Sequence, residues 1–272
     1  MVALGLGTLG IIAGMCAVRC VAERDAAAAP SDLPAKMAEP NATPVLVELF
    51  TSEGCSSCPP ADAVLTRLER MQPLKDARVI ALGHHVDYWD GIGWPDPFSS
   101  AAATARQRSY GPLGGGTYTP QAVVDGQAQL VGSRGSALES AIAEAAKRPH
   151  AKIDIEVAPA PAADGSFDLT IKTSALPRGA TSDAMLYVAI AQSAARVAVP
   201  RGENAGSTLD HTAIARDVRS IATVPAQGSS AKTTIRVPTA ISGKPSFDAV
   251  AFVQEQKSRR ILGTSMVALK AR

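Results

Sequence analysis

The six residues Gly54-Cys55-Ser56-Ser57-Cys58-Pro59 lie between an apolar run and a helical pattern. Residues 45–50, Val-Leu-Val-Glu-Leu-Phe, have the composition of a strand that is buried on both faces. Proline is tolerated in the first turn of a helix, where its missing N–H group has no intrahelical partner. Apolar residues then recur on one face of a helix, at Val64, Leu65, Leu68 and Met71. The two cysteines are therefore predicted to lie at a strand-to-helix junction.

This position favours a reactive sulfur. At a helix N-terminus, the unpaired N–H groups and the positive end of the helix dipole stabilise a thiolate. We therefore expect Cys55 to be the exposed, reactive cysteine and Cys58 to be the buried one.

Two other roles remain open for this Cys-x-x-Cys pair. A structural zinc site needs four ligands, and the other cysteines, Cys16 and Cys20, lie in the N-terminal apolar segment, so histidines would have to complete it. A structural disulfide is the second alternative, although so short a loop gains little from closure entropy. We favour a redox-active dithiol over both.

The composition describes a globular chain without a strong charge bias. Its 272 residues carry a net charge of +2, and the hydrophobic content of 46% is enough for a core of ordinary size. Lysine and arginine do not cluster, so the sequence predicts no nucleic-acid partner.

The N-terminal segment resembles a targeting sequence. Residues 2–18 contain no charge and four alanines occupy positions 26–29, so residues 1–29 are predicted to be a signal peptide or an N-terminal membrane anchor. Residues 30–43, which contain Pro30, Pro34 and Pro40, are predicted to be an extended linker. We expect a periplasmic or secreted protein, in an oxidising compartment that suits a disulfide-active pair.

A second apolar run, residues 79–83, follows the predicted helix. With residues 45–50 it predicts a β-α-β unit with parallel strands. Ligands of such sheets bind beyond the carboxyl ends of the strands. His84, His85 and Asp87 follow the second strand and are therefore candidate site residues on the same edge as Cys55.

Residues 88–117 form a predicted insertion that is rich in glycine and proline, with a helix over residues 99–110. Six of the eleven aromatic residues lie between positions 88 and 118, namely Tyr88, Trp89, Trp94, Phe98, Tyr110 and Tyr118. We expect these rings either to cover the candidate site or to form a small core for the insertion itself.

The segment Tyr118-Thr119-Pro120-Gln121 leads into a short predicted strand. A proline that precedes a strand and follows a β-branched residue is a candidate for a cis peptide bond. We predict that the Thr119–Pro120 bond is cis and that this loop contacts the two cysteines.

Three motifs of this sequence are similar to those of a known family. They are ELFTSEGCSSCPPAD (residues 48–62), HVDYWDGIGWPDPF (85–98) and YTPQAVVDG (118–126). They resemble a bacterial family of secreted thioredoxin-fold proteins classed as a domain of unknown function, and the match covers most of residues 44–270. The resemblance implies a thioredoxin-like α/β domain over residues 44–150. In it, Cys55 takes the place of the nucleophile, Cys58 the resolving position and Pro120 that of the cis-proline.

The same motifs contain further candidate supporting residues, Trp89, Tyr118 and Gln121. In thioredoxins, an acidic residue on the strand before the dithiol helps to move the proton of the resolving cysteine. Here Glu48 lies seven residues before Cys55 instead of the usual six. A buried Glu48 should be either protonated or paired.

Residues 151–272 are predicted to form an antiparallel β-sandwich-like domain, because several runs alternate between apolar and polar residues without helical periodicity. Residues 201–206, followed by Asp210 and His211, are interpreted as a polar, glycine-rich loop. This loop either reaches the thioredoxin-like edge or is an ordinary surface loop.

The favoured function is thiol–disulfide exchange with protein thiols or disulfides in the periplasm, without a cofactor. Cys55 would attack, Cys58 would resolve the mixed disulfide, and Thr119-Pro120 would align the partner strand. One alternative is a copper or other metal carrier that uses both cysteines with His84 or His85. Another is a binding module without catalysis, and the sequence predicts no oligomeric state.

Overall fold

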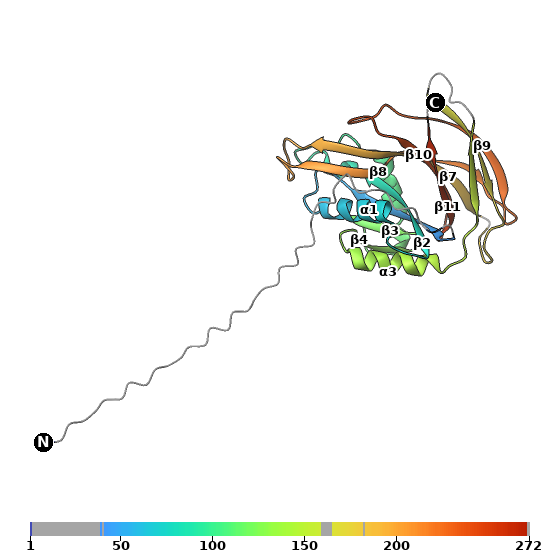
Figure 1. Cartoon of the computed structure of the whole chain (residues 1–272), viewed down its shortest axis with the longest axis horizontal. Helices are drawn as coiled ribbons and strands as arrows, with labels where there is room; N and C mark the ends of the chain where they lie inside the picture. Colours follow the sequence, from blue (N-terminus) through green and yellow to red (C-terminus); the bar gives the residue numbers. More distant parts are fainter. Residues whose placement is uncertain (2–38, 40, 159–164, 182, 271–272) are drawn as a thin grey trace.

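The computed structural model describes residues 1, 39, 41–158, 165–181 and 183–270 (Figure 1). The predicted signal peptide or anchor, Cys16, Cys20 and most of the linker lie outside these residues. No helix in the described ranges is long and apolar enough to cross a membrane.

Strand β1 (Thr43–Thr51) lies inside the larger of two sheets, in agreement with its apolar sequence. Its residues Val45, Val47 and Leu49 pack against helices α1 (Pro59–Met71) and α3 (Gly135–Ala146). On the opposite face, Leu46 packs with residues of later strands, among them Phe252. Because both faces are buried, successive residues of β1 are apolar and the strand shows no polar alternation.

The larger sheet contains eight strands in the order β11-β10-β7-β8-β2-β1-β3-β4. Strands β1 and β2 (Ala77–His85) are parallel and are joined by α1, so the predicted β-α-β unit is confirmed. Strand β3 (Gln121–Val124) pairs antiparallel with β1, and β4 (Ala128–Val131) pairs antiparallel with β3.

The insertion contributes a helix and two short 3-10 turns before β3. The predicted helix over residues 99–110 is confirmed as α2 (Ala101–Ser109), whose first turn is capped by the Ser100 hydroxyl. The 3-10 turns are η1 (Asp87–Trp89) and η2 (Gly111–Leu113). The ring of Trp89 and the side chain of Tyr110 pack with Phe50, so these two aromatic residues of the insertion contact β1.

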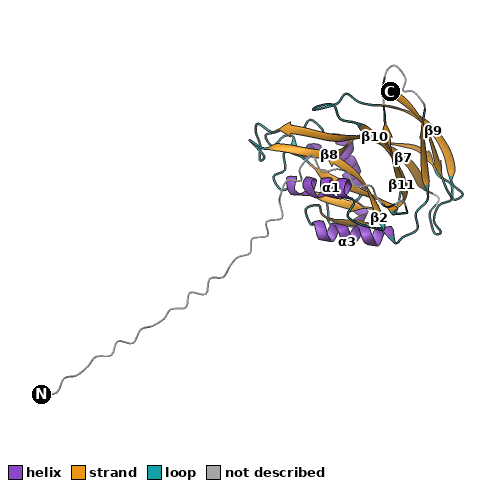
Figure 2. Ribbon diagram, in the orientation of Figure 1, coloured by secondary structure: helices purple, strands orange, loops and turns teal. Residues whose placement is uncertain are grey.

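After α3 the described chain contains only strands and loops, some of which surround β9 while others extend to the side of α1 (Figure 2). A three-stranded sheet in the order β5-β6-β9 shares a core with strands of the larger sheet. The strands concerned are β5 (Ile153–Val157), β6 (Ser166–Thr173), β9 (Ser229–Arg236), β7 (Ala184–Ala198), β10 (Phe247–Glu255) and β11 (Ile261–Leu269).

The predicted boundary between residues 150 and 151 does not interrupt the larger sheet. Strand β8 (Thr208–Thr223) runs parallel to β2 and pairs Ile214 with Gly83. A Cβ atom at Gly83 would lie 3.3 Å from the carbonyl oxygen of Thr212, so the glycine permits this close approach. Strands from both sides of the predicted boundary therefore share one sheet.

Strand β8 also corrects the sequence interpretation of Asp210 and His211. Both were expected in a loop, but they lie in β8, where they pair with Arg196 and Ala195 of β7. The long β7–β8 hairpin is stabilised by this backbone pairing, which the polar sequence of its tip does not reveal.

Candidate functional site

The turn between β1 and α1 holds the two cysteines. They form a disulfide, with Cα atoms 5.4 Å apart. Cys58 is the N-cap residue of α1, and its carbonyl oxygen accepts hydrogen bonds from the N–H groups of Ala61 and Asp62 at 2.8 and 3.2 Å. Cys55 lies three residues before the cap, and its Sγ is 3.4 Å from the Ser57 hydroxyl.

Both cysteines have an exposed fraction of 0%. The prediction that Cys55 is the exposed sulfur is therefore wrong for this disulfide form. Only Ser56 and Ser57, between the two cysteines, are exposed in this turn. The cause is tertiary, because segments distant in sequence pack over Cys55.

One of these segments is the loop before β3. The Thr119–Pro120 bond is cis, as predicted. The Thr119 hydroxyl donates a hydrogen bond to Cys55 Sγ at 3.4 Å, and Trp89 Nε1 donates to the Thr119 oxygen at 2.8 Å. Trp89 and Thr119 thus form a short chain of donors that ends on the sulfur.

The residues on either side of Thr119-Pro120 are held by a residue that the sequence did not single out. Gln107 of α2 donates hydrogen bonds to the Tyr118 carbonyl oxygen at 2.7 Å and to Gln121 Oε1 at 3.0 Å. Tyr118 and Gln121 are thus tied to α2 on the two sides of the loop.

The second segment is the tip of the β7–β8 hairpin, residues 199–207, which we call the hairpin tip. Asn204 Nδ2 donates to the carbonyl oxygens of Glu53 and Cys55 at 2.8 and 3.1 Å. Glu203 Oε2 accepts a hydrogen bond from the Ser56 N–H at 3.0 Å. Gly202 lies against Trp94, since a Cβ at Gly202 would be 3.1 Å from Trp94 Cβ. The loop predicted over residues 201–206 therefore reaches the dithiol edge.

Five buried titratable side chains lie beneath this contact, namely Glu53, Asp62, His85, Asp96 and His211. Glu53 Oε1 lies 3.0 Å from His211 Nε2, and Glu53 Oε2 accepts from Trp94 Nε1 at 2.7 Å. Asp96 Oδ2 lies 2.6 Å from His85 Nδ1 and accepts from the Glu53 N–H at 2.8 Å. The two histidine rings are 4.7 Å apart.

The charges in this cluster shift the proton affinities of its members. Burial alone would lower the pKa of His85, but the adjacent Asp96 carboxylate raises it above its ordinary value. Burial raises the pKa of Asp62, although His211 and His85 oppose that rise. Asp62 accepts a hydrogen bond from the Thr51 hydroxyl at 3.1 Å, which places its carboxyl group at the end of β1.

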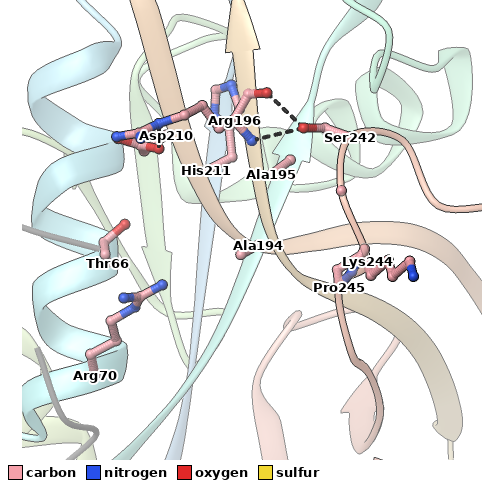
Figure 3. Close-up of a pocket in the computed structure, with 11 residues that line it drawn as sticks. Thr66, Arg70, Ala194, Ala195, Arg196, Asp210, His211, Ser242, Lys244 and Pro245 are labelled. Carbon is pink, nitrogen blue, oxygen red and sulfur yellow. Dashed lines mark hydrogen bonds and ion pairs between the residues drawn. The ribbon is translucent and has the colours of Figure 1, made fainter. Parts of the chain in front are cut away.

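A cavity of about 310 Å³ borders this cluster on the side of α1 (Figure 3). Thr66 and Arg70 of α1 line one wall, and His211 lies on the hairpin side. The Ser242 hydroxyl donates to the Arg196 carbonyl oxygen at 2.7 Å and closes the third side. His211 therefore separates this cavity from Glu53 and the dithiol turn.

Glu48 belongs to a different cluster. Because Val47 and Leu49 face α1, Glu48 points to the opposite face of the sheet. There it binds Arg106 through both carboxylate oxygens, accepts from the Tyr110 hydroxyl, and lies 2.8 Å from His84 Nε2. Burial alone would raise the pKa of Glu48, but Arg106 and His84 hold it well below its usual range. Glu48 is therefore a paired carboxylate.

The remaining candidates at the end of β2 and just after it lie in different surroundings. His84 stacks on Phe50 beside Glu48, and burial lowers its pKa. Asp87 accepts a hydrogen bond from the Thr104 hydroxyl of α2 at 2.6 Å. Of His84, His85, Asp87 and Trp89, His85 is linked to the dithiol turn through Asp96, and Trp89 is linked to it through Thr119.

The alternative metal site was expected to use Cys55, Cys58 and His85. In the described part of the chain, no three or more His, Cys, Asp or Glu side chains form a group that could hold a metal ion. The two sulfurs are bonded to each other, and His85 Nδ1 is hydrogen-bonded to Asp96.

A family model described as "Protein of unknown function (DUF1223)" matches residues 46–254. The chain belongs to the DUF1223 family. The matched region contains the dithiol turn, the Thr119-Pro120 loop and the hairpin tip, so the whole site lies inside the family region.

Among solved structures, this DUF1223 protein is similar to protein AGR_C_4864 from Agrobacterium tumefaciens, with 24% identity and a TM-score of 0.60. The match covers 85% of this chain and 99% of that one. It is also similar to HBP35 of Porphyromonas gingivalis, with 14% identity and a TM-score of 0.62 over 87% of this chain and 78% of that one. These similarities show a shared fold. A search of curated proteins finds no match.

The contact between Thr119 and Cys55 in this DUF1223 protein gives a first prediction. A hydrogen bond to a charged group stabilises it by about 1.5–3 kcal/mol. Removal of the hydroxyl in Thr119→Val should therefore lower the thiolate fraction of Cys55 and slow alkylation of the reduced protein at pH 7 about tenfold. Alkylation by iodoacetamide, followed by mass spectrometry of the modified peptide, measures this rate.

The matched control is Thr119→Ser, which keeps the hydroxyl and should react like the wild type. At alkaline pH the difference between Thr119→Val and the wild type should disappear, because the thiol is then ionised in both. Equal rates for the Val and Ser variants at pH 7 would show that Thr119 does not act on the sulfur.

Proposed function

We propose that this protein is a thiol–disulfide oxidoreductase of the periplasm or the cell exterior, acting on protein thiols or disulfides. One observation carries the proposal: Cys55 and Cys58 are bridged at the start of α1, and the Thr119 hydroxyl points at the Cys55 sulfur. A disulfide that only braced the fold would have no use for a donor aimed at one of its sulfurs.

We also propose that residues 44–150 are thioredoxin-like. In support, β1 and β2 are parallel and joined by α1, β3 and β4 are antiparallel, and Pro120 directly precedes β3. In such an arrangement the backbone of the Pro120 loop is available to pair with an extended substrate segment beside the dithiol.

The proposed reaction begins with the reduced protein. The Cys55 thiolate attacks one sulfur of a substrate disulfide, so a mixed disulfide forms and the other substrate sulfur leaves as a thiolate that takes a proton. Cys58 then loses its proton and attacks Cys55 Sγ, which releases the second substrate thiol. The protein ends as the Cys55–Cys58 disulfide and has transferred two electrons to the substrate. The same steps in reverse oxidise a substrate dithiol.

Asp62 suits the proton transfer from Cys58 better than Glu48 does. Residues four positions apart on a helix lie on one face, so Asp62 lies next to Cys58 along α1, and burial raises the pKa of its carboxyl group, which favours the protonated form. Glu48 faces the other side of the sheet and is paired with Arg106.

A redox titration tests the proposed function. The Cys55–Cys58 pair should equilibrate reversibly with glutathione buffers as a two-electron couple, and the protein should exchange disulfides with a reduced or oxidised model protein. Cys55→Ser should abolish exchange, whereas Cys58→Ser should accumulate the mixed disulfide. A pair that titrates normally while the wild-type protein exchanges with no model substrate would instead support a binding module.

A further inference from the structure

The sulfur of Cys55 is contacted by hydroxyl groups from two separate segments of the chain. Ser57 Oγ, in the dithiol turn itself, lies 3.4 Å from Cys55 Sγ, and Thr119 Oγ1 of the loop before β3 lies at the same distance of 3.4 Å. A disulfide sulfur has no proton to donate, so both hydroxyl groups are the donors in these contacts. Cys55 Sγ therefore accepts two hydrogen bonds in the oxidised protein.

Trp89 determines where the hydroxyl proton of Thr119 points. An indole N–H group can only donate, so Thr119 Oγ1 accepts the hydrogen bond from Trp89 Nε1 at 2.8 Å. The single proton of the Thr119 hydroxyl then serves another acceptor, which is Cys55 Sγ. Trp89 is itself fixed by packing with Phe50 and by close approach to Gly54, where a Cβ atom would lie 3.2 Å from Trp89 Cβ. Trp89 is therefore a positioning residue that acts on the sulfur through Thr119.

These donors stabilise the reduced form more than the disulfide. A disulfide sulfur is a neutral, weak acceptor, whereas a thiolate is charged, and hydrogen bonds to charged groups are about twice as strong as neutral ones. The hydrogen bonds from Ser57 and Thr119 should therefore strengthen when the disulfide opens and Cys55 becomes a thiolate. A pair whose reduced form is stabilised has a less negative reduction potential.

The carboxylates near the dithiol turn oppose this effect only weakly. Glu53 is hydrogen-bonded to His211, with 3.0 Å between Oε1 and Nε2. Burial raises the pKa of Asp62, which favours its neutral form. Glu203 is exposed, so water and salt screen its charge. The two hydroxyl groups contact the sulfur of Cys55 directly, so we expect their effect to exceed that of these carboxylates.

We propose that Ser57, Thr119 and Trp89 make this protein a disulfide donor, which oxidises substrate dithiols rather than reducing substrate disulfides. The inference rests on the proposed thiol–disulfide exchange and gives that exchange a direction.

The oxidation of a substrate dithiol takes two steps. One substrate thiolate attacks Cys55 Sγ, the Cys55–Cys58 bond breaks, and Cys58 leaves with the electron pair and takes up a proton. The second substrate thiolate then attacks the substrate sulfur of the mixed disulfide, and Cys55 leaves as the thiolate that Ser57 and Thr119 stabilise. The substrate has lost two electrons, and a more oxidising disulfide must remove them from the protein before the next cycle.

Equilibration with glutathione buffers at pH 7 tests the proposal on the full chain, with alkylation and mass spectrometry of the peptide that contains both cysteines as the readout. We expect the wild-type pair to have a less negative reduction potential than glutathione. Trp89→Phe and Ser57→Ala should each shift the equilibrium about tenfold toward the disulfide, which corresponds to about 30 mV.

Two comparisons separate the donors from packing effects. Ser56→Ala removes the neighbouring exposed hydroxyl and should equilibrate as the wild type does. In a Thr119→Val background, Trp89→Phe should cause no further shift, because Trp89 acts through the Thr119 hydroxyl. The rate of Cys55 alkylation in the reduced protein should have its midpoint at higher pH in Trp89→Phe and Ser57→Ala, and at the wild-type pH in Ser56→Ala.

A wild-type pair with a more negative potential than glutathione would overturn the proposed direction. Test variants that equilibrate and titrate as Ser56→Ala does would overturn the role of the donors. Both results come from glutathione buffers alone, so they differ from a failure of the proposed function, in which the wild type exchanges with no model protein. Ser57 is exposed, so Ser57→Ala decides the matter even if Trp89→Phe does not fold.

Discussion

Replacement of Glu48 by Gln is expected to lower the free energy of unfolding by about 3–5 kcal/mol, the range found when one partner of a buried ion pair is removed. The Arg106 guanidinium would keep its charge in the interior without a carboxylate. The substitution preserves the shape of the side chain, so the loss reports on charge and hydrogen bonding rather than on a cavity. Urea unfolding of the oxidised protein, followed by circular dichroism, measures it.

Two controls isolate the role of the buried charge. Glu139→Gln breaks a partly exposed ion pair with Arg67 and should change stability by less than about 1 kcal/mol. The double variant Glu48→Gln with Arg106→Met should recover part of the loss, because no unpaired cation remains. A Glu48→Gln protein as stable as Glu139→Gln would contradict our account of this cluster.

The stability difference should also depend on pH. The pKa of Glu48 is lowered in the folded protein. Its contribution to the free energy of unfolding is therefore complete at pH values above the pKa of glutamate in the unfolded chain, about 4.3. The contribution is lost as the pH falls from there toward the lowered folded-state value. The advantage of the wild type over Glu48→Gln should therefore be constant from about pH 6 to 8 and should shrink below about pH 4.

The second large effect concerns access to the disulfide. Both sulfurs are fully buried, and the hairpin tip is one of the two segments that pack over the dithiol turn, so we expect a reductant to reach the sulfurs when the tip moves away. Asn204→Ala removes two hydrogen bonds, each with a net contribution of about 1 kcal/mol. The open population, and with it the rate of reduction by tris(carboxyethyl)phosphine, should rise about 30-fold.

The matched control lies on the same hairpin. Asp210→Asn breaks the exposed pair with Arg196 but leaves the contacts of Asn204 unchanged, and it should alter the reduction rate less than about threefold. Unfolding measured in parallel must show that Asn204→Ala remains folded during the assay. Equal reduction rates in Asn204→Ala and the wild type would show that the hairpin tip does not limit access.

Local patterns explain the predictions that the structure confirmed. The apolar run of β1, the proline at the start of α1 and the spacing of Leu65 and Leu68 act within one turn or one strand. The cis bond at Pro120 followed from its β-branched neighbour and the strand after it. Such features depend on short stretches of chain, so they can be predicted from the sequence.

Some residues contact the site only through long-range packing, and the sequence did not predict their place there. Asn204 and Glu203 lie about 150 positions from the dithiol turn, and only the pairing of β8 with β2 brings their loop to that edge. Gln107 lies on a helix with little hydrophobic pattern, and no local signal connects it with the Pro120 loop.

The amino-acid sequence by itself determined the β-α-β unit, the place of the cysteine pair in it and the cis-proline loop. Tertiary structure alone decided that Cys55 is covered, that Glu48 pairs with Arg106 on the far face, and that the hairpin tip reaches Ser56. The physical reason is the range of the interactions. Helix starts and strand patterns are set by neighbouring residues, whereas burial and ion pairing depend on which distant strands share a sheet.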